Sequence, residues 1–409
     1  MTTIEQLHLL QSDTGSSLFQ AIRELDPQPN TGLAVISKLR KSFPPELVAG
    51  AMTMHLLRIR AREKFERADE MWFTRDGLEQ STSEMISNWR TQRFTQHRRI
   101  VDLCCGIGGD ATAFARRSDR DGEQFTIVDT DPVHLEMAES NVRLHSNQVS
   151  LTAHNRMAED IDLSLFDAVF IDPARRDDKG RHATGKSNPS LAWCTGIAST
   201  VPVVGVKLAP GLPHHLIPDG WGFETVAIGH DLKEAILWSP AMQPAPFQAT
   251  VITGSGSASM TRVPGSTVGT REPRPAIWLY DPNPAITRAG LVEDLARTLD
   301  AHKIDDQIGF LVADREVATP CARSHRILAS LPWHERNLQQ VVRDLDGGVV
   351  VIRRRGLPGN VDDIQHRLRG QGPNSLFIAM TRMEDRPWAI VCSGRSPEIP
   401  AVEHRSIRP

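Results

Sequence analysis

The stretch that decides the fold is Val101-Asp102-Leu103-Cys104-Cys105-Gly106-Ile107-Gly108-Gly109-Asp110. An apolar segment enters a run of glycines and then a helical pattern, which predicts a strand, a tight turn and a helix. Glycine accepts positive φ angles and lets a ligand approach the backbone closely. In open α/β sheets, ligands bind at such crossovers, outside the carboxyl ends of the strands. We therefore expect a cofactor at this turn.

Around this turn, apolar segments alternate with helix-length segments. This alternation is typical of the α/β class and predicts a Rossmann-like parallel sheet with helices on both faces. The expected strands are 99–103, 124–128, 149–153, 168–171 and 203–207. Three closely spaced runs follow at 222–228, 234–238 and 248–252, and they predict that this end of the sheet is partly antiparallel.

The flanking regions differ from this core. Residues 1–95 are expected to be an N-terminal helical region, in which Ser81 and Glu84 have the spacing of a capping box. Residues 96–253 form the expected sheet domain, and residues 254–274, rich in Gly, Ser, Thr and Pro, are expected to be a linker. Beyond them, apolar runs separated by helical stretches predict one or two small α+β domains.

Composition sets broad limits. The 409 residues are 40% hydrophobic and 24% charged, with a formal net charge of −3, so the whole-chain charge does not point to nucleic acid. We expect no membrane span and no secretory signal, because no apolar run reaches about 18 residues and the first ten residues lack a basic segment before an apolar one. Five cysteines without a C-x-x-C pair, and histidines without metal-ligand spacing, predict no metal site. Reduced thiols favour a cytoplasmic location.

Two details favour S-adenosylmethionine (SAM) over a dinucleotide at the glycine turn. The third glycine of a G-x-G-x-x-G pattern is replaced by Ala111. The carboxylate of Asp102 would repel a pyrophosphate but attract a methionine ammonium group. Asp129, at the end of the next strand, can accept both ribose hydroxyls of an adenosine, and Asp131-Pro132 then begins a helix. The alternative is a glycine turn that serves packing alone.

A polar turn, Asp172-Pro173-Ala174-Arg175-Arg176, follows the fourth expected strand. Asp172 could accept hydrogen bonds from a substrate amine and orient its lone pair, and the arginines could bind phosphate. Lys207, at the end of the fifth strand, could reach the same site or extend to water. The run 230–234 is a second polar turn, which either closes the substrate face or is a hairpin loop. The alternative for 172–176 is a solvated loop in which Asp172 caps a turn.

These motifs resemble class I SAM-dependent methyltransferases. More closely, the chain resembles bacterial methyltransferases that carry a ferredoxin-like domain and then a THUMP-like domain. The similarity rests on LEQSTSE (78–84), the glycine turn (101–110), DPARR (172–176), DLKEAILW (231–238), LYDPNPAITRAG (279–290) and RRRGLP (353–358). It implies a ferredoxin-like domain at 275–335, a THUMP-like domain at 336–409, SAM as the cofactor and RNA as the substrate class.

The resemblance also assigns site residues. Contacts to SAM are expected from Asp102, Cys104, Gly106, Gly108, Asp110, Asp129, Thr130, Arg156, Met157 and Gln80, and catalytic roles from Asp172, Pro173, Arg175 and Lys207. The acid at the adenine edge stays open among Asn155, Glu159 and Asp160. The turn at 172–176 lacks the aromatic residue that amino-methyltransferases stack on a flipped base, and no cysteine motif typical of 5-methyluridine methyltransferases follows, so the methylated atom stays open.

Three functions remain: an RNA methyltransferase, a methyltransferase of a small molecule or protein, and an RNA-binding protein with a vestigial SAM site. The oligomeric state stays open. For the first function, five arginines of the C-terminal third are expected to contact RNA phosphates: Arg353, Arg354, Arg355, Arg367 and Arg369. The alternative is that they pair with nearby acids: Asp344, Asp346, Asp362 and Asp363.

Overall fold

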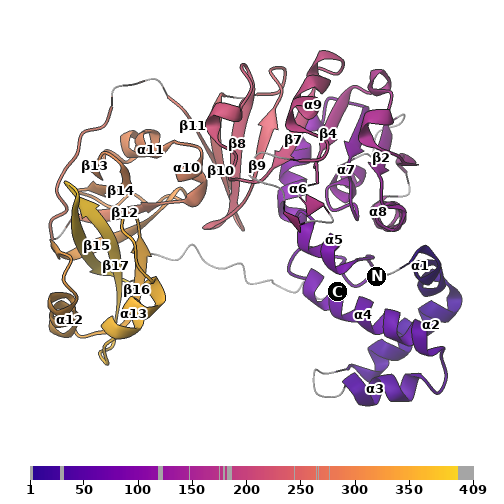
Figure 1. Ribbon diagram of the computed structural model, residues 1–409, viewed down its shortest axis with the longest axis horizontal. Helices are drawn as coiled ribbons and strands as arrows, with labels where there is room; N and C mark the ends of the chain where they lie inside the picture. The colour runs from indigo at the N-terminus through magenta and orange to yellow at the C-terminus, as the bar shows by residue number, and fades with distance from the viewer. Residues whose placement is uncertain are drawn as a thin grey trace. The chain divides into compact units, whose positions relative to one another are not determined.

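The chain forms two compact units in the computed structural model (Figure 1). The first comprises Met1–Trp221 with Ile236–Gln243, and the second comprises Gly222–Ala235 with Pro244–Pro409. Within them, the structure describes residues 3–27, 32–117, 123–146, 148–174, 187–243, 245–263, 265, 267–275 and 277–394, and the backbone of 176–177 and 180–181. In these described residues, no helix is both long and apolar enough to cross a membrane.

The N-terminal region of the first unit is helical, as predicted. Its helices are α1 (Ile4–Gln11), α2 (Asp13–Leu25), α3 (Gly32–Leu39), α4 (Pro45–Ala61), α5 (Arg75–Gln80), α6 (Glu84–Thr91) and the short η1 (Gln92–Phe94). Their buried Leu, Met and Phe side chains share one core with Ile107 of the glycine turn and Met137 of α8 (Pro132–His145). The N-terminal helices therefore pack directly on the elements that hold the predicted cofactor turn.

The predicted capping box is wrong. Helix α6 begins after Ser83, which makes no side-chain cap, and Ser81 instead ends α5. The carboxylate of Glu84 accepts a hydrogen bond from the backbone N–H of Glu66 and pairs with Arg116. Glu84 thus contacts distant segments, so it is not available to cap its own helix.

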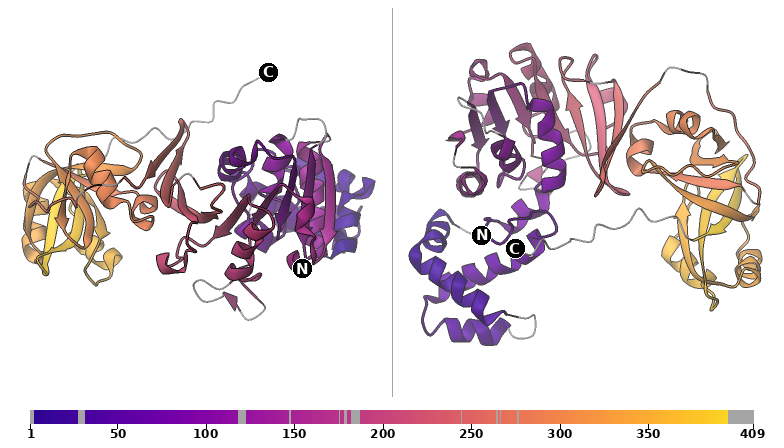
Figure 2. Two further views of the ribbon diagram at one scale, coloured as in Figure 1. Left: turned by 90° about the horizontal axis from the view of Figure 1, so that it is seen from above. Right: turned by 180° about the vertical axis from the view of Figure 1, so that it is seen from behind.

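Five parallel strands of a nine-stranded sheet form the centre of the first unit and confirm the predicted fold class (Figures 1 and 2). Their order is β7 (Val204–Leu208), β4 (Ala168–Ile171), β1 (Arg99–Leu103), β2 (Gln124–Asp129) and β3 (Ser150–Asn155). Strands β4 and β7 are buried at every position, as is typical of parallel strands with both faces covered. The associated helices are α7 (Ala111–Arg117), α8 (Pro132–His145), α9 (Leu191–Gly196), η2 (Ala158–Asp160), η3 (Leu163–Leu165), η4 (Ile197–Ser199) and η5 (His214–Leu216).

One local prediction holds here. Asp131 caps α8, with its carboxylate accepting hydrogen bonds from the N–H groups of Val133 and His134, and Pro132 occupies the first turn. The polar turn after β4 continues into a two-stranded hairpin of β5 (Arg176–Asp177) and β6 (Gly180–Arg181).

The second unit begins with β8 (Gly222–Ile228), and β9 (Asp231–Trp238) then runs from the second unit into the first. Strand β10 (Phe247–Thr253) is parallel to β8, and β11 (Gly256–Thr261) is antiparallel to β10, which confirms a partly antiparallel arrangement. The segment 254–274 is therefore not a linker throughout. Strand β11 folds back on β10 through a tight turn at Gly256, whose φ is +140°, and a hydroxyl pair joins Thr250 to Ser259 at 2.7 Å.

A seven-stranded sheet follows in the second unit, in the order β13-β14-β12-β15-β18-β17-β16. The strands are β12 (Trp278–Pro282), β13 (His302–Asp305), β14 (Ile308–Ala313), β15 (Ala322–Pro332), β16 (Gly347–Arg354), β17 (Asn374–Met383) and β18 (Arg386–Ser393). The helices are α10 (Pro284–Arg288), α11 (Val292–Leu299), α12 (Glu335–Asp344) and α13 (Val361–Leu368). Strand β15 pairs with both β12 and β18, so one sheet contains both of the C-terminal domains expected from sequence.

The two faces of this sheet differ. One face packs on α10 and α11 at one end and on α12 and α13 at the other. The other face carries an apolar cluster supplied by strands and their turns, including Leu279, Phe310, Ile327 and Phe377. The sheet curls around this cluster, because Arg382 of β17 donates a hydrogen bond to Gln307 in the turn between β13 and β14.

Candidate cofactor and catalytic site

The glycine turn after β1 combines an open side and a packed side. Cys104, Gly106 and Gly108 have φ angles of +59°, +53° and +83°. A Cβ atom on Gly106 would meet no atom within 4 Å, whereas one on Gly108 would lie 3.0 Å from the Cα of Ala138. Gly108 is therefore required for the close approach of α8, and Gly106 leaves the backbone open to a ligand.

Asp102 is a buried carboxylate without a partner. It is the second-last residue of β1, it is 1% exposed, and neither carboxylate oxygen has a hydrogen-bond partner among the described residues. Burial raises the pKa of Asp102 well above its ordinary value, and the nearby carboxylates of Asp110 and Asp172 raise it further. Asp102 can ionise in such a place only beside a cation, because a buried unpaired charge is strongly destabilising. The ammonium group of a methionine moiety meets this requirement.

Asp129 lies beside the open glycine. One of its oxygens accepts the N–H of Gly106 at 2.8 Å, and the other accepts the N–H of Asp131 at 2.9 Å. Burial raises the pKa of Asp129, and these two hydrogen bonds oppose that effect. Each carboxylate oxygen has a second lone pair, so Asp129 retains the capacity to accept the two ribose hydroxyls.

Both carboxylate oxygens of Asp110 have partners within the protein. One oxygen accepts the hydroxyl of Thr82 at 2.8 Å, and the other pairs with Arg90, whose side chain is fully buried. The guanidinium of Arg90 also lies 4.6 Å from the ring centre of Phe170 in β4. Asp110 therefore fastens the segment before β1 to the glycine turn, which differs from the predicted contact with SAM.

Lys64 completes this attachment, a role that was not predicted from sequence. Its ammonium donates hydrogen bonds to the carbonyls of Leu78, Glu79 and Ser81 at 2.7, 3.2 and 2.9 Å, at the C-terminal end of α5. A Cβ on Gly109 would lie 3.2 Å from both the Cβ of Ser81 and the carbonyl oxygen of Thr82. We call Lys64, Thr82, Glu84, Arg90 and Asp110 the clamp, because together they hold this segment against the glycine turn.

The predicted catalytic pair is close together. The ammonium of Lys207 lies 2.5 Å from an oxygen of Asp172, and the side chains are 4% and 26% exposed. Lys207 thus points to Asp172 rather than extending to water. The backbone N–H of Asp172 donates to the carbonyl of Leu103 at 3.2 Å, which places Asp172 next to the glycine turn. The pair can hold one carboxylate oxygen in place while the other accepts a hydrogen bond from a substrate.

The structure says less about the remaining predicted site residues, for which it gives mainly burial or exposure. Pro173 is buried behind Asp172, Gln80 is exposed at the end of α5, and Arg175 lies outside the described residues. Thr130, Arg156 and Met157 are exposed at the ends of β2 and β3, and Met157 is 50% exposed.

Of the three residues that could lie at the adenine edge, Asn155 makes side-chain hydrogen bonds within the protein. The side-chain amide of Asn155 donates to the carbonyls of Asp129 and Thr130, at 2.9 and 3.0 Å, and so holds the loop after β2. Glu159 and Asp160 lie in η2 and are exposed. Asn155 thus has a structural role, and the choice between the two acids stays open.

Four of the five arginines predicted to contact RNA have protein partners, and the fifth, Arg369, is exposed. Arg353 and Arg355 pair with Asp281, Arg367 pairs with Glu335, and Arg354 donates to the carbonyl of Gly359. These partners differ from the four acids named as the alternative. Pairing therefore reduces, but does not cancel, the positive charge of this region.

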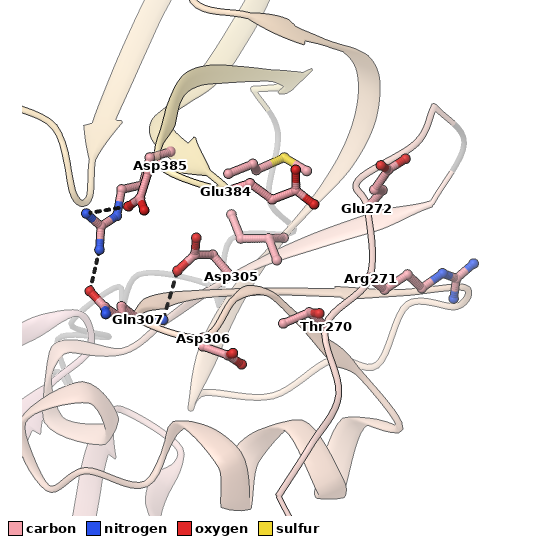
Figure 3. Close-up of a pocket in the computed structure, with 11 residues that line it drawn as sticks. Thr270, Arg271, Glu272, Asp305, Asp306, Gln307, Glu384 and Asp385 are labelled. Carbon is pink, nitrogen blue, oxygen red and sulfur yellow. Dashed lines mark hydrogen bonds and ion pairs between the residues drawn. The ribbon is translucent and has the colours of Figure 1, made fainter.

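A cavity of about 370 Å³ lies in the second unit, away from the residues above (Figure 3). Its lining includes five acids: Glu272, Asp305, Asp306, Glu384 and Asp385. Arg382 pairs with Asp385, and Arg271 pairs with Asp314 and points away from the acids. The acidic lining disfavours a phosphate, and within the described residues no His, Cys, Asp and Glu group is arranged to hold a metal ion.

Comparisons with known proteins agree with this geometry. Residues 67–186 match the methyltransferase small domain, residues 322–394 match the THUMP domain-like family, and residues 3–61 match a domain of unknown function. A crystal structure from Porphyromonas gingivalis W83, provisionally assigned as a methyltransferase, has the same fold, with a TM-score of 0.68 at 18% identity over 87% of this chain and 92% of that one.

Sequence relatives decide the family. Two uncharacterized SAM-dependent methyltransferases of Mycobacterium tuberculosis, from strains CDC 1551 and H37Rv, are each 30% identical over 318 residues, which cover 76% of this chain and 84% of the relative. The match spans both the catalytic sheet and part of the C-terminal module. The chain belongs to this family of SAM-dependent methyltransferases.

Proposed function

We propose that this methyltransferase acts on RNA. The observation that carries the proposal is the match of residues 322–394 to the THUMP domain-like family. The resemblance to methyltransferases with such domains implies RNA as the substrate class. A methyl group on a sulfonium is strongly electrophilic, so the protein has mainly to bind SAM and to orient the attacking atom.

We assign the cofactor roles to two carboxylates. Asp102 is expected to accept the ammonium group, because its two oxygens are buried and otherwise unpartnered. Asp129 is expected to accept the ribose hydroxyls beside the open backbone of Gly106. Cys104, with a positive φ, turns the chain between these two residues.

We assign the orientation of the substrate to Asp172. The Lys207 ammonium fixes one of its oxygens, and the other can accept an N–H or O–H of the nucleophile. Lys207 is then a positioning residue, because it acts through Asp172.

One experiment tests the proposal directly. The purified full chain is incubated with SAM carrying a tritiated methyl group and with total bacterial RNA or, in parallel, total bacterial protein. We expect the label in the RNA fraction, and nucleoside analysis then identifies the methylated atom. Label that enters only protein or small molecules would refute the RNA assignment, and an Asp172→Ala variant controls for contaminating enzymes.

A further inference from the structure

A cluster of cationic side chains lies in the second unit, apart from the cofactor site. It surrounds Asp281 of β12, whose side chain is only 3% exposed. Arg353 and Arg355 approach its two oxygens at 3.1 and 2.8 Å. Arg323 of β15 is the cross-strand neighbour of Asp281, and no ion pair of Arg323 is found among the described residues. Three arginines and one carboxylate leave two net positive charges.

A turn from the other sheet of this unit joins the cluster. The side-chain amide of Asn283 donates to the carbonyl of Gly229 at 2.7 Å and so fixes the turn between β8 and β9. Burial, together with Arg323 and Arg353, lowers the pKa of His230 to about 4. A neutral imidazole beside arginines can donate a hydrogen bond without adding charge.

The alternation of the strands places this charge beside apolar surface. On β16, Val351 and Arg353 are register partners of Phe377 and Ala379 of β17, so they lie on the face of the inner apolar cluster. Among the described residues, no helix packs on this face near the β16 edge, where Val349 and Val351 are 52% and 48% exposed. The sheet therefore presents cations and an exposed apolar strip together.

Strand β15 adds polar side chains to the same face of the sheet. On β15, Arg323 and His325 share one face, and the His325 ring stacks on Phe377, with 4.0 Å between ring centres. His325 is 3% exposed, and its Nε2 atom is buried without a partner among the described residues.

We propose that Arg323 and Arg353, with His230 beside them, bind the phosphate backbone of the RNA substrate, and that Val349 and Val351 contact its sugars. This inference rests on the proposed function. Arginine suits a phosphate because its planar fork donates two hydrogen bonds at once. An RNA strand has negative phosphates for the arginines and less polar sugars for the exposed valines. A free phosphate has only the negative charge.

The chain contains a matched control for the test. Arg326 is also exposed on β15, and no ion pair of Arg326 is found in the described part of the chain, but it points to the opposite face. We propose to measure the binding of unfractionated bacterial tRNA to the full chain, to Arg323→Ala and to Arg326→Ala, from low to high salt. Phosphate contacts are largely independent of sequence, so this probe suffices.

We expect Arg323→Ala to bind tRNA roughly three- to tenfold more weakly at low salt, and to lower the slope of log affinity against log salt by about 0.9. Arg326→Ala should match the wild type in both quantities. Arg353→Ala provides a second variant with the same expected loss, since Asp281 keeps Arg355 as its partner. Equal thermal unfolding midpoints show that all of these variants are folded.

The outcomes separate the two proposals. If wild type binds tRNA and accepts RNA for methylation, but Arg323→Ala and Arg326→Ala behave alike, the placement of the phosphate site is overturned and the proposed function stands. If the wild type binds no tRNA at about 50 mM salt, where phosphate contacts are strong, both proposals are overturned.

Discussion

Replacing Asp102 with asparagine should have opposite effects on folding and on cofactor binding. Asp102 is buried and unpartnered, and burial, followed by the charges of Asp110 and Asp172, raises its pKa above the value in the unfolded chain. The folded protein therefore binds a proton that the unfolded chain releases. The resulting stability is complete below the unfolded pKa of about 3.9 and is lost as the pH rises toward the folded pKa. Asparagine cannot ionise, so the Asp102→Asn variant does not lose folding stability in this way as the pH rises.

The expected magnitudes follow from the same burial. The asparagine amide is also unsatisfied, but it avoids the additional cost of burying an ionised group, so Asp102→Asn should stabilise the SAM-free protein by about 1–3 kcal/mol at neutral pH. For a unit of about 200 residues, each kcal/mol raises the melting temperature by about 2–4 °C. Loss of a charge-assisted hydrogen bond to the ammonium group should weaken SAM binding by about 1.5–3 kcal/mol, or roughly ten- to a hundredfold.

Proton release gives the most specific assay. If Asp102 is protonated in the free protein and ionised beside the ammonium group, SAM binding must release a proton, and affinity must rise with pH. Calorimetry near pH 6 in two buffers of different ionisation enthalpy measures this proton. We expect the wild type to release a proton when SAM binds, and we expect no proton from this position in the Asp102→Asn variant. Equal affinity and equal proton release in both proteins, or a lower melting temperature of the variant, would refute the argument.

Three further changes test the other residues. Asp129→Ala should weaken SAM binding by about 1.5–3 kcal/mol in calorimetry, and an unchanged affinity would remove Asp129 from the site. Asp172→Ala should bind SAM normally but lose roughly a hundredfold or more in single-turnover rate on the true substrate, since the nucleophile is no longer oriented. Lys207→Met, which keeps the side-chain volume, should lower kcat in the same direction and leave the KM for SAM unchanged; a changed KM with normal kcat contradicts the positioning role. Arg90→Met should cost about 3–5 kcal/mol in urea unfolding, because it leaves Asp110 as an unpaired buried charge, and adding Asp110→Asn should recover part of this loss.

The sequence predicts the parallel sheet well for a physical reason. Strands such as 168–171 are buried on both faces, so they appear as continuous apolar runs with polar residues at their ends. Parallel strands end at one edge of a sheet, and this brings Asp102, Asp129 and Asp172 together without knowledge of any contact.

The parts that sequence did not predict depend on contacts between distant segments. Strand β15 alternates irregularly between buried and exposed positions, and its register shifts between Ile327 and Ala329, so its sequence lacks the period of a strand. Arg90 in α6 and Lys64 in the turn after α4 are residue types that are usually exposed, and only the fold shows that they reach Asp110 and the end of α5. The domain boundaries at 335 and 336 stay a prediction, although the THUMP-like match begins at Ala322.

The clamp links the glycine turn, and so cofactor binding, to the N-terminal helices. Thermodynamic coupling is reciprocal: if the N-terminal helices favour the conformation of the glycine turn that binds SAM, then bound SAM must favour the ordered state of those helices to the same extent. Amide hydrogen exchange in α5 and α6 should therefore slow when SAM binds, even though Lys64 and Arg90 lie behind the turn. By the same equality, a destabilising substitution in the N-terminal helices would appear in a binding assay as a loss of cofactor affinity.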